Sequence, residues 1–220
     1  MNRSVQLLRD ELQSRIGSCD SAALLRKKPA RETLPSVVDE IPRGALTEIK
    51  GAPSSGRTSL LHSLLAGITY RDEFCALIDV QDSFDPESAE AAGVRLSQLV
   101  WVRCGGAVEK GLKAADMLIH GGGFGLAAID FGNTADSILR RIPMVAWFRL
   151  RQGVENTRTA FVVAAGQFHA HPCSVLQISL QRNRTLWHGK MAGCQLHGFE
   201  VGARSLRDHR LREQAFRVCG

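Results

Sequence analysis

Residues 51–59 read GAPSSGRTS and have the glycine spacing of a phosphate-binding loop. Four residues separate Gly51 from Gly56, and the hydroxyl residue Thr58 follows Arg57. In the pattern G-x-x-x-x-G-K-[ST], backbone N–H groups bind phosphate, the lysine adds charge and the hydroxyl ligates Mg²⁺. An arginine stands here where the pattern has lysine. The stretch therefore predicts phosphate binding by a loop with one altered cationic residue.

Two interpretations of the Arg57 side chain remain open. The guanidinium group of Arg57 keeps the positive charge of lysine but is larger, planar and more rigidly oriented, so it can contact phosphate while crowding the γ position. Alternatively, the side chain swings outward and pairs with a surface carboxylate. We expect weakened hydrolysis more than abolished binding. The competing reading of the whole stretch is an inherited scaffold whose loop no longer holds a ligand.

A second element supports nucleotide binding. The apolar run at residues 126–129 ends in Asp130, and an acidic residue at the carboxyl end of a buried strand can hold Mg²⁺ and its waters. We therefore expect ATP and Mg²⁺ as cofactors, with Thr58 and Asp130 as the metal-binding residues. The residues expected to bind the nucleotide in this loop are Gly51, Ser54, Ser55, Gly56, Arg57, Thr58 and Ser59.

Around the loop, short apolar runs alternate with amphipathic segments. This alternation predicts an α/β fold with a mostly parallel sheet covered by helices on both faces. Strands are expected over residues 45–51, 74–80, 98–104, 125–131 and 159–166, and helices over 57–70, 107–120 and 135–153, with a short helix opened by Asp85 and Pro86.

The pattern changes after Pro172. Residues 174–182 and 185–193 flank Asn183 and predict an antiparallel hairpin at the sheet edge. Residues 194–204 can add another strand, and we expect the basic tail, 205–220, to be frayed or helical.

Three parts of the chain are expected: an N-terminal helix and linker over 1–43, a nucleotide-binding core over 44–190 and a basic C-terminal tail over 191–220. In the first part, Val5, Leu8 and Leu12 recur at helical spacing. They can pack on the chain's own core or on another protomer, so oligomerisation is open.

Composition excludes some classes of protein. No run approaches the roughly 18 uncharged apolar residues of a membrane helix, and the first residues lack the apolar run of a secretory signal. We expect a cytoplasmic protein with no membrane association. The six cysteines are scattered, which argues against a disulfide framework in a reducing compartment. The net charge of +6 permits contact with DNA or an acidic partner.

Three longer stretches are informative: IPRGALTEIKGAPSSGRTSLL (41–61), CALIDVQDSFDPESAEAAGVRLSQLVWVRC (75–104) and GLAAIDF (125–131). Together they resemble the core of the RecA recombinases. The most specific part is IDVQDSFDP followed by GV. The stretch IPMVAWFRLRQGVENTRTAFVV (142–163) is similar to the RecA-like ImuA proteins, accessory factors of SOS-induced error-prone DNA synthesis. The resemblance, over about residues 41–182, implies a RecA-like nucleotide-binding fold and a DNA-repair context.

The chain departs from the RecA pattern in three ways. Gln81 occupies the position of the catalytic glutamate, and a glutamine orients water but cannot accept its proton. The neighbouring Asp82 can substitute only if its side chain turns toward the site. Arg57 replaces the loop lysine, and the DNA-binding loops are almost absent. By contrast, Gln167 matches the glutamine that ends the fifth core strand and senses the γ-phosphate.

Other candidate residues carry weaker signals. A zinc site can be assembled from a subset of His169, His171, Cys173, Cys194 and His197, but their spacing is irregular and buried thiols with polar histidines are the better reading. In the tail, helical spacing would place Arg207 with Arg210, and Arg210 with Arg217, on one face that can contact DNA phosphates. Trp187 can stack a base, although a lone hairpin aromatic more often packs.

These observations favour a RecA-like nucleotide-binding accessory protein of DNA repair and the SOS response, with weak or no ATP hydrolysis. Its expected partners are proteins of the translesion polymerase machinery. The alternative is an active DNA-dependent ATPase that resembles a recombinase. A third reading is a nucleotide-free interaction module, such as an SOS cell-division inhibitor.

Overall fold

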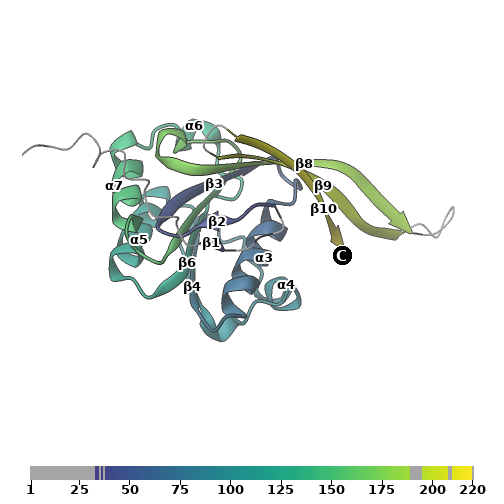
Figure 1. Cartoon of the computed structure of the whole chain (residues 1–220), viewed down its shortest axis with the longest axis horizontal. Helices are drawn as coiled ribbons and strands as arrows, with labels where there is room; N and C mark the ends of the chain where they lie inside the picture. Colours follow the sequence, from purple (N-terminus) through teal and green to yellow (C-terminus); the bar gives the residue numbers. More distant parts are fainter. Residues whose placement is uncertain (1–32, 35, 37, 189–194, 208–209, 220) are drawn as a thin grey trace, which may run out of the picture. The chain divides into compact units, whose positions relative to one another are not determined.

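The strand that leads into the phosphate-binding loop lies near the middle of an eight-stranded sheet (Figure 1). The computed structural model describes residues 33–34, 36, 38–188, 195–207 and 210–219. The strand order is β10-β9-β8-β3-β7-β6-β4-β5. The pairs from β8 through β3 to β5 are parallel, whereas β8, β9 and β10 pair antiparallel. The expected α/β fold, with its C-terminal antiparallel part, is confirmed.

The elements follow one another in this order. The N-terminal half holds β1 (Thr33–Leu34), β2 (Ile41–Pro42), β3 (Ala45–Gly51), α3 (Arg57–Thr69), β4 (Phe74–Asp79), α4 (Pro86–Ala91), the 3-10 helix η1 (Leu96–Gln98), β5 (Leu99–Arg103) and α5 (Val108–Gly121). The C-terminal half holds β6 (Phe124–Asp130), α6 (Asp136–Leu139), α7 (Met144–Val154), β7 (Ala160–Ala165), the 3-10 helix η2 (His171–Cys173), β8 (Ser174–His188), β9 (Gln195–Arg207) and β10 (Arg210–Cys219).

Two hydrophobic cores lie on the two faces of the sheet. Successive side chains of a strand point to opposite faces, so in β6 Ala128 enters one core and Ile129 the other. Helices α3 and α4 cover the first face, with Leu61 and Leu65 among the buried residues. Helices α5 and α7 cover the second face, where Trp147 is buried. Both faces of the parallel strands are thus removed from water, which accounts for their continuous apolar runs.

Capping residues and prolines determine where several of the helices begin. Helix α4 starts at Pro86, and the Asp85 carboxylate accepts hydrogen bonds from the N–H groups of Glu87 and Ser88. The single helix expected over 135–153 is wrong, because α6 ends at Leu139 and α7 begins after Pro143. Proline lacks an N–H group and disfavours helical backbone in the residue before it.

The C-terminal strands differ from the expectation. Asn183 is no hairpin turn, since β8 runs without interruption from Ser174 to His188 and the register shifts between Arg182 and Arg184. Asn183 is the extra residue of a bulge, and its side chain fills the space beside Gly202. A Cβ added to Gly202 would lie 2.7 Å from the side-chain amide nitrogen of Asn183.

The frayed or helical tail expected over residues 205–220 is also wrong. Residues 210–219 form β10, which pairs with β9 throughout. Phe216 and Val218 are half-buried while Arg217 between them is exposed, and this alternation is the period of a strand. The amphipathic helix expected near residues 5–16 lies outside the described residues. Within the described part of the chain, no helix is long and apolar enough to cross a membrane.

Candidate nucleotide-binding site

A cavity of about 420 Å³ lies where strands β3, β4 and β6 end. The carboxyl edge of a parallel sheet is where α/β folds bind their ligands. The lining residues come from the phosphate-binding loop, from the segments after β4 and β6, and from β9: Ala52, Pro53, Ser54, Gly56, Arg57, Thr58, Ser59, Gln81, Ser83, Asp130, Gly132, Asn133 and Phe199. Five of the seven predicted loop residues therefore line one cavity, together with Gln81 and Asp130.

The loop has the backbone that a phosphate site requires. Ser54 adopts φ 61° and Gly56 φ 90°, and the Ser55 N–H donates to the Ala52 carbonyl oxygen at 3.1 Å. Gly56 is the N-cap of α3, and no side chain caps this helix end. The first N–H groups of an α-helix have no acceptor within the helix, so those of α3 remain for a bound anion at the positive end of the helix dipole.

Both loop glycines are required by their neighbours. A Cβ on Gly51 would lie 2.1 Å from the Ser55 Oγ, and one on Gly56 would lie 2.7 Å from a Val201 methyl carbon. Gly51 and Ser55 do not line the cavity but shape the loop beneath it. The Ser55 hydroxyl is buried with no hydrogen-bond partner among the described residues.

Arg57 points inward, which neither sequence reading anticipated. Its side chain is only 8% exposed, and its two terminal nitrogens donate to the carbonyl oxygens of Gly51 at 2.8 Å and Gly132 at 2.6 Å. The outward orientation, with a surface carboxylate as partner, is therefore wrong. Arg57 ties the start of the loop to the segment after β6. Its Nε lies buried and without a partner among the described residues.

Asp130 and Thr58 meet the requirements of a magnesium site. Both line the cavity, Thr58 from the first turn of α3 and Asp130 from the end of β6. Burial raises the pKa of Asp130, whereas the Gly132 N–H, which donates to its Oδ1 at 2.8 Å, and the Arg57 charge act in the opposite direction. Hydroxyl and carboxylate oxygens are the ligands that Mg²⁺ takes beside phosphates. The residues present fit the ion.

Gln81 follows β4 and faces the cavity. Its amide nitrogen donates to the Thr134 hydroxyl at 2.8 Å, and that hydroxyl donates to the Phe131 carbonyl oxygen. Asp82 turns elsewhere: its carboxylate accepts from the Gly105 N–H at 3.2 Å and pairs with Arg103 at 3.3 Å. Gln81 is thus held at the site, and Asp82 is engaged outside it.

Gln167 was predicted to be part of the site but does not line the cavity, whereas Phe199 lines the cavity but was not predicted. Gln167 is exposed just beyond β7 and is not among the lining residues, so its role as γ-phosphate sensor stays a prediction. Phe199 was missed, because it lies in β9, far along the chain from the loop. Only the pairing of β9 with β8, and of β8 with β3, brings it to the cavity.

Residues 32–136 match the family model of the RecA N-terminal domain. This part of the chain is similar to the RecA N-terminal domain. It contains the phosphate-binding loop, Gln81 and Asp130, whereas β7 to β10 lie beyond it. The RecA-like segment therefore carries the predicted chemistry.

Known RecA proteins align with a similar stretch. Protein RecA of Lactobacillus delbrueckii subsp. bulgaricus is 37% identical over 89 residues, which is 40% of this chain and 27% of that protein. Protein RecA of Rickettsia massiliae is 37% identical over 90 residues, 41% of this chain and 26% of that protein. Protein RecA of Borrelia hermsii is 36% identical over 89 residues, which is 40% of this chain and 25% of that protein. The alignments thus span about a quarter of these curated relatives.

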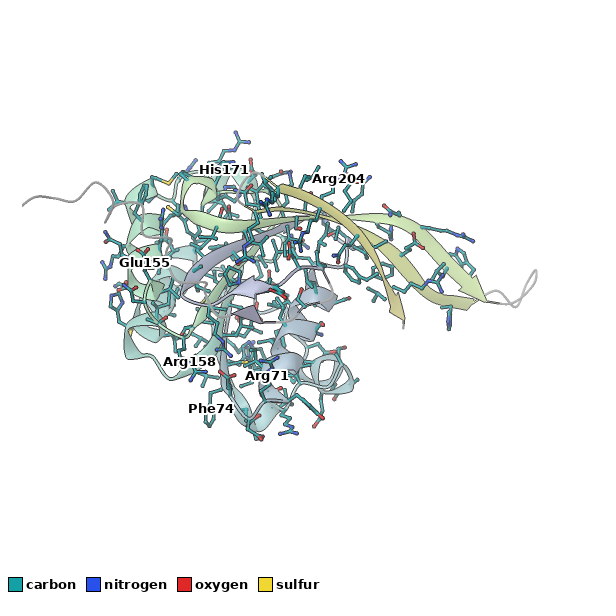
Figure 2. The ribbon with its side chains drawn as sticks, in the orientation of Figure 1. Arg71, Phe74, Glu155, Arg158, His171 and Arg204 are labelled. Atoms are coloured by element: carbon teal, nitrogen blue, oxygen red, sulfur yellow. The ribbon has the colours of Figure 1, made fainter. Side chains whose placement is uncertain are left out.

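The possible zinc site among the histidines and cysteines is not supported by the described part of the structure. Within the described residues, no three His, Cys, Asp or Glu side chains could together hold a metal ion. Cys173 is buried, His171 (labelled in Figure 2) belongs to η2, and Cys194 falls outside the described residues. Burial lowers the pKa of His169, whose Nε2 lies 3.3 Å from an Asp136 carboxylate oxygen.

The arginines lie on strands rather than on a helix. Arg207 and Arg210 are register partners, but Arg210 and Arg217, an odd number of residues apart, point to opposite faces of β10. Arg204 projects from the face opposite α3 (Figure 2) and pairs with Glu213 at 2.9 Å. The shared helix face for DNA is wrong. Trp187 is 62% exposed, so it does not pack in a core of the described residues.

Proposed function

We propose that this protein binds a nucleoside triphosphate with Mg²⁺ and hydrolyses it weakly or not at all. In this proposal it is a cytoplasmic accessory protein of DNA repair, of the ImuA type that serves the SOS response, with partners in the translesion polymerase machinery. The RecA-like segment supports nucleotide binding and a repair context. The similarity of residues 142–163 to ImuA proteins supports the narrower assignment.

One observation carries the expected lack of turnover. Asp130 is the single carboxylate among the described residues that line the cavity. Asp130 is assigned to the metal, so no carboxylate remains to take the proton of an attacking water. Gln81 stands where the RecA pattern has its catalytic glutamate. Its amide nitrogen donates to the Thr134 hydroxyl, and its amide oxygen can accept a hydrogen bond from a water but cannot accept the proton. We therefore expect the site to bind a nucleotide without efficient hydrolysis.

Each residue has a defined role in this proposal. The N–H groups at the start of α3 bind phosphate oxygens, and the Thr58 hydroxyl and Asp130 carboxylate hold the metal. Bound Mg²⁺ would neutralise phosphate charge. Arg57, held by hydrogen bonds to two carbonyl oxygens, lines the cavity and supplies positive charge there. Each of these interactions favours binding, and none abstracts a proton.

Equilibrium binding of a fluorescent ATP analogue with Mg²⁺ tests the proposal. Wild type should bind, Thr58→Ala should bind more weakly, and Arg57→Lys should retain binding. Hydrolysis should be at most weak in wild type and should increase in Gln81→Glu, which restores a base. Robust hydrolysis by the wild type, stimulated by single-stranded DNA, would support the active ATPase instead.

A second function is favoured by the same arginine. Arg57 holds the two sides of the cavity together through protein carbonyls alone, so the loop is braced without any ligand. This arrangement suits a nucleotide-free interaction module. Failure of wild type, Thr58→Ala and Arg57→Lys alike to bind the analogue, with a stable protein complex formed in its absence, would decide for this alternative.

A further inference from the structure

Phe199 gives the cavity an aromatic wall that neither the phosphate-binding loop nor the RecA-like segment supplies. Its half-buried side chain contacts the α3-side core and lines the cavity. It is the single aromatic residue among the described lining residues. Most of the others are small or polar, and they suit phosphate and metal better than the flat apolar face of a nucleobase.

The position of Phe199 is fixed relative to the loop. Val201, two residues further along β9, lies on the same face and is fully buried against Gly56. Phe199 also lies between its register partners Thr185 of β8 and Val218 of β10. A half-buried aromatic side chain that packs against the hydrophobic core, as Phe199 does, loses little further freedom when a ligand stacks on it. The ring is therefore a preformed platform beside the phosphate site.

We propose that Phe199 stacks the base of the nucleotide whose phosphates the loop binds. This inference rests on the proposed function. Stacking uses the π-face that every base has, and the phenyl ring offers no hydrogen bond to a base edge. Phe199 therefore selects nucleoside polyphosphates over inorganic polyphosphate, and its ring does not discriminate adenine from guanine.

Calorimetric titration with two ligands separates the base from the phosphates. Wild type, Phe199→Ala, Phe199→Leu and Phe199→Trp are titrated with a non-hydrolysable ATP analogue and with inorganic tripolyphosphate, both with Mg²⁺. Phe199→Ala should weaken binding of the analogue roughly 5- to 100-fold and leave tripolyphosphate unchanged. Phe199→Leu, which keeps apolar volume without the ring, should weaken it as well. Phe199→Trp should bind at least as tightly as wild type.

A matched control is Leu211→Ala, since Leu211 is an exposed apolar residue of β10 away from the cavity. It should bind both ligands as wild type does. Equal weakening of the analogue and tripolyphosphate by Phe199→Leu would show that Phe199 only shapes the loop, and would overturn the stacking while leaving nucleotide binding intact. If wild type bound neither ligand, the proposed function and this inference would both fall.

Discussion

Replacement of Arg57 tests whether this residue is a structural brace. Its guanidinium donates to the carbonyl oxygens of Gly51 and Gly132, and the side chain is almost entirely buried. A hydrogen bond from a charged donor contributes about 1.5–3 kcal/mol net, and both would be lost in Arg57→Ala. Water in the adjoining cavity can rehydrate the freed carbonyls, so we expect a loss of about 2–4 kcal/mol in the free energy of unfolding.

Arg57→Lys should lose less, about 1–2 kcal/mol, because a compact ammonium can satisfy one carbonyl but not span both. The control is Arg103→Ala, which removes an exposed ion pair to Asp82 near the same site and should cost about 0–1 kcal/mol. Urea unfolding followed by circular dichroism measures all four proteins. If Arg57→Ala were no less stable than Arg103→Ala, the hydrogen bonds of Arg57 would not brace the loop and the argument would fail.

Three further predictions concern buried groups. Burial lowers the pKa of His62. Below pH 6.5, the ordinary pKa of histidine, the unfolded chain therefore binds a proton that the folded chain excludes, and the free energy of unfolding should fall as the pH is lowered. His62→Leu should reduce this pH dependence in urea unfolding, and an unchanged dependence would contradict burial of His62 as its cause. Burial raises the pKa of Cys75 to about 12, so its thiol stays protonated and unreactive in the folded protein at pH 8. Iodoacetamide should therefore modify Cys75 only in urea, as mass spectrometry of the peptides would show. Rapid labelling of Cys75 in the folded protein would contradict this prediction. Arg43→Met should lower the free energy of unfolding by about 2 kcal/mol. Buried Arg43 donates to the Arg158 carbonyl oxygen at 2.8 Å and pairs at 2.6 Å with Glu73, which is partly exposed and can be rehydrated. A urea-unfolding loss equal to that of an exposed arginine would refute this prediction.

The local parts of the site could be predicted from the sequence. The spacing of Gly51 and Gly56, the strand before them and the helix after them are all encoded within about twenty residues. Asp130 could be predicted in the same way, because it is a charged residue at the end of an apolar strand. Such features depend on backbone preferences and on the alternation of buried side chains, which adjacent residues determine.

Long-range features were beyond the same reasoning. The direction of Arg57 depends on the Gly132 carbonyl, 75 residues away in sequence. The place of Phe199 depends on the register of three strands, and the shift at Asn183 alters which side chains face the core. A one-residue slip reverses the faces of a strand, so no count of hydrophobic residues along the sequence could have placed Phe199 at the cavity.

The order of the strands also constrains how the phosphate-binding loop is assembled during folding. The strand before the loop, β3, pairs with residues 160–165 on one side and 174–180 on the other. Both partners lie beyond the RecA-like stretch of residues 32–136, so a fragment limited to that stretch would contain the loop but neither neighbour of its strand. Each pairing closes more than a hundred residues of chain, an entropic cost that slows folding. The loop is therefore synthesised before either of the strands, β7 and β8, that pair with β3 in the folded protein.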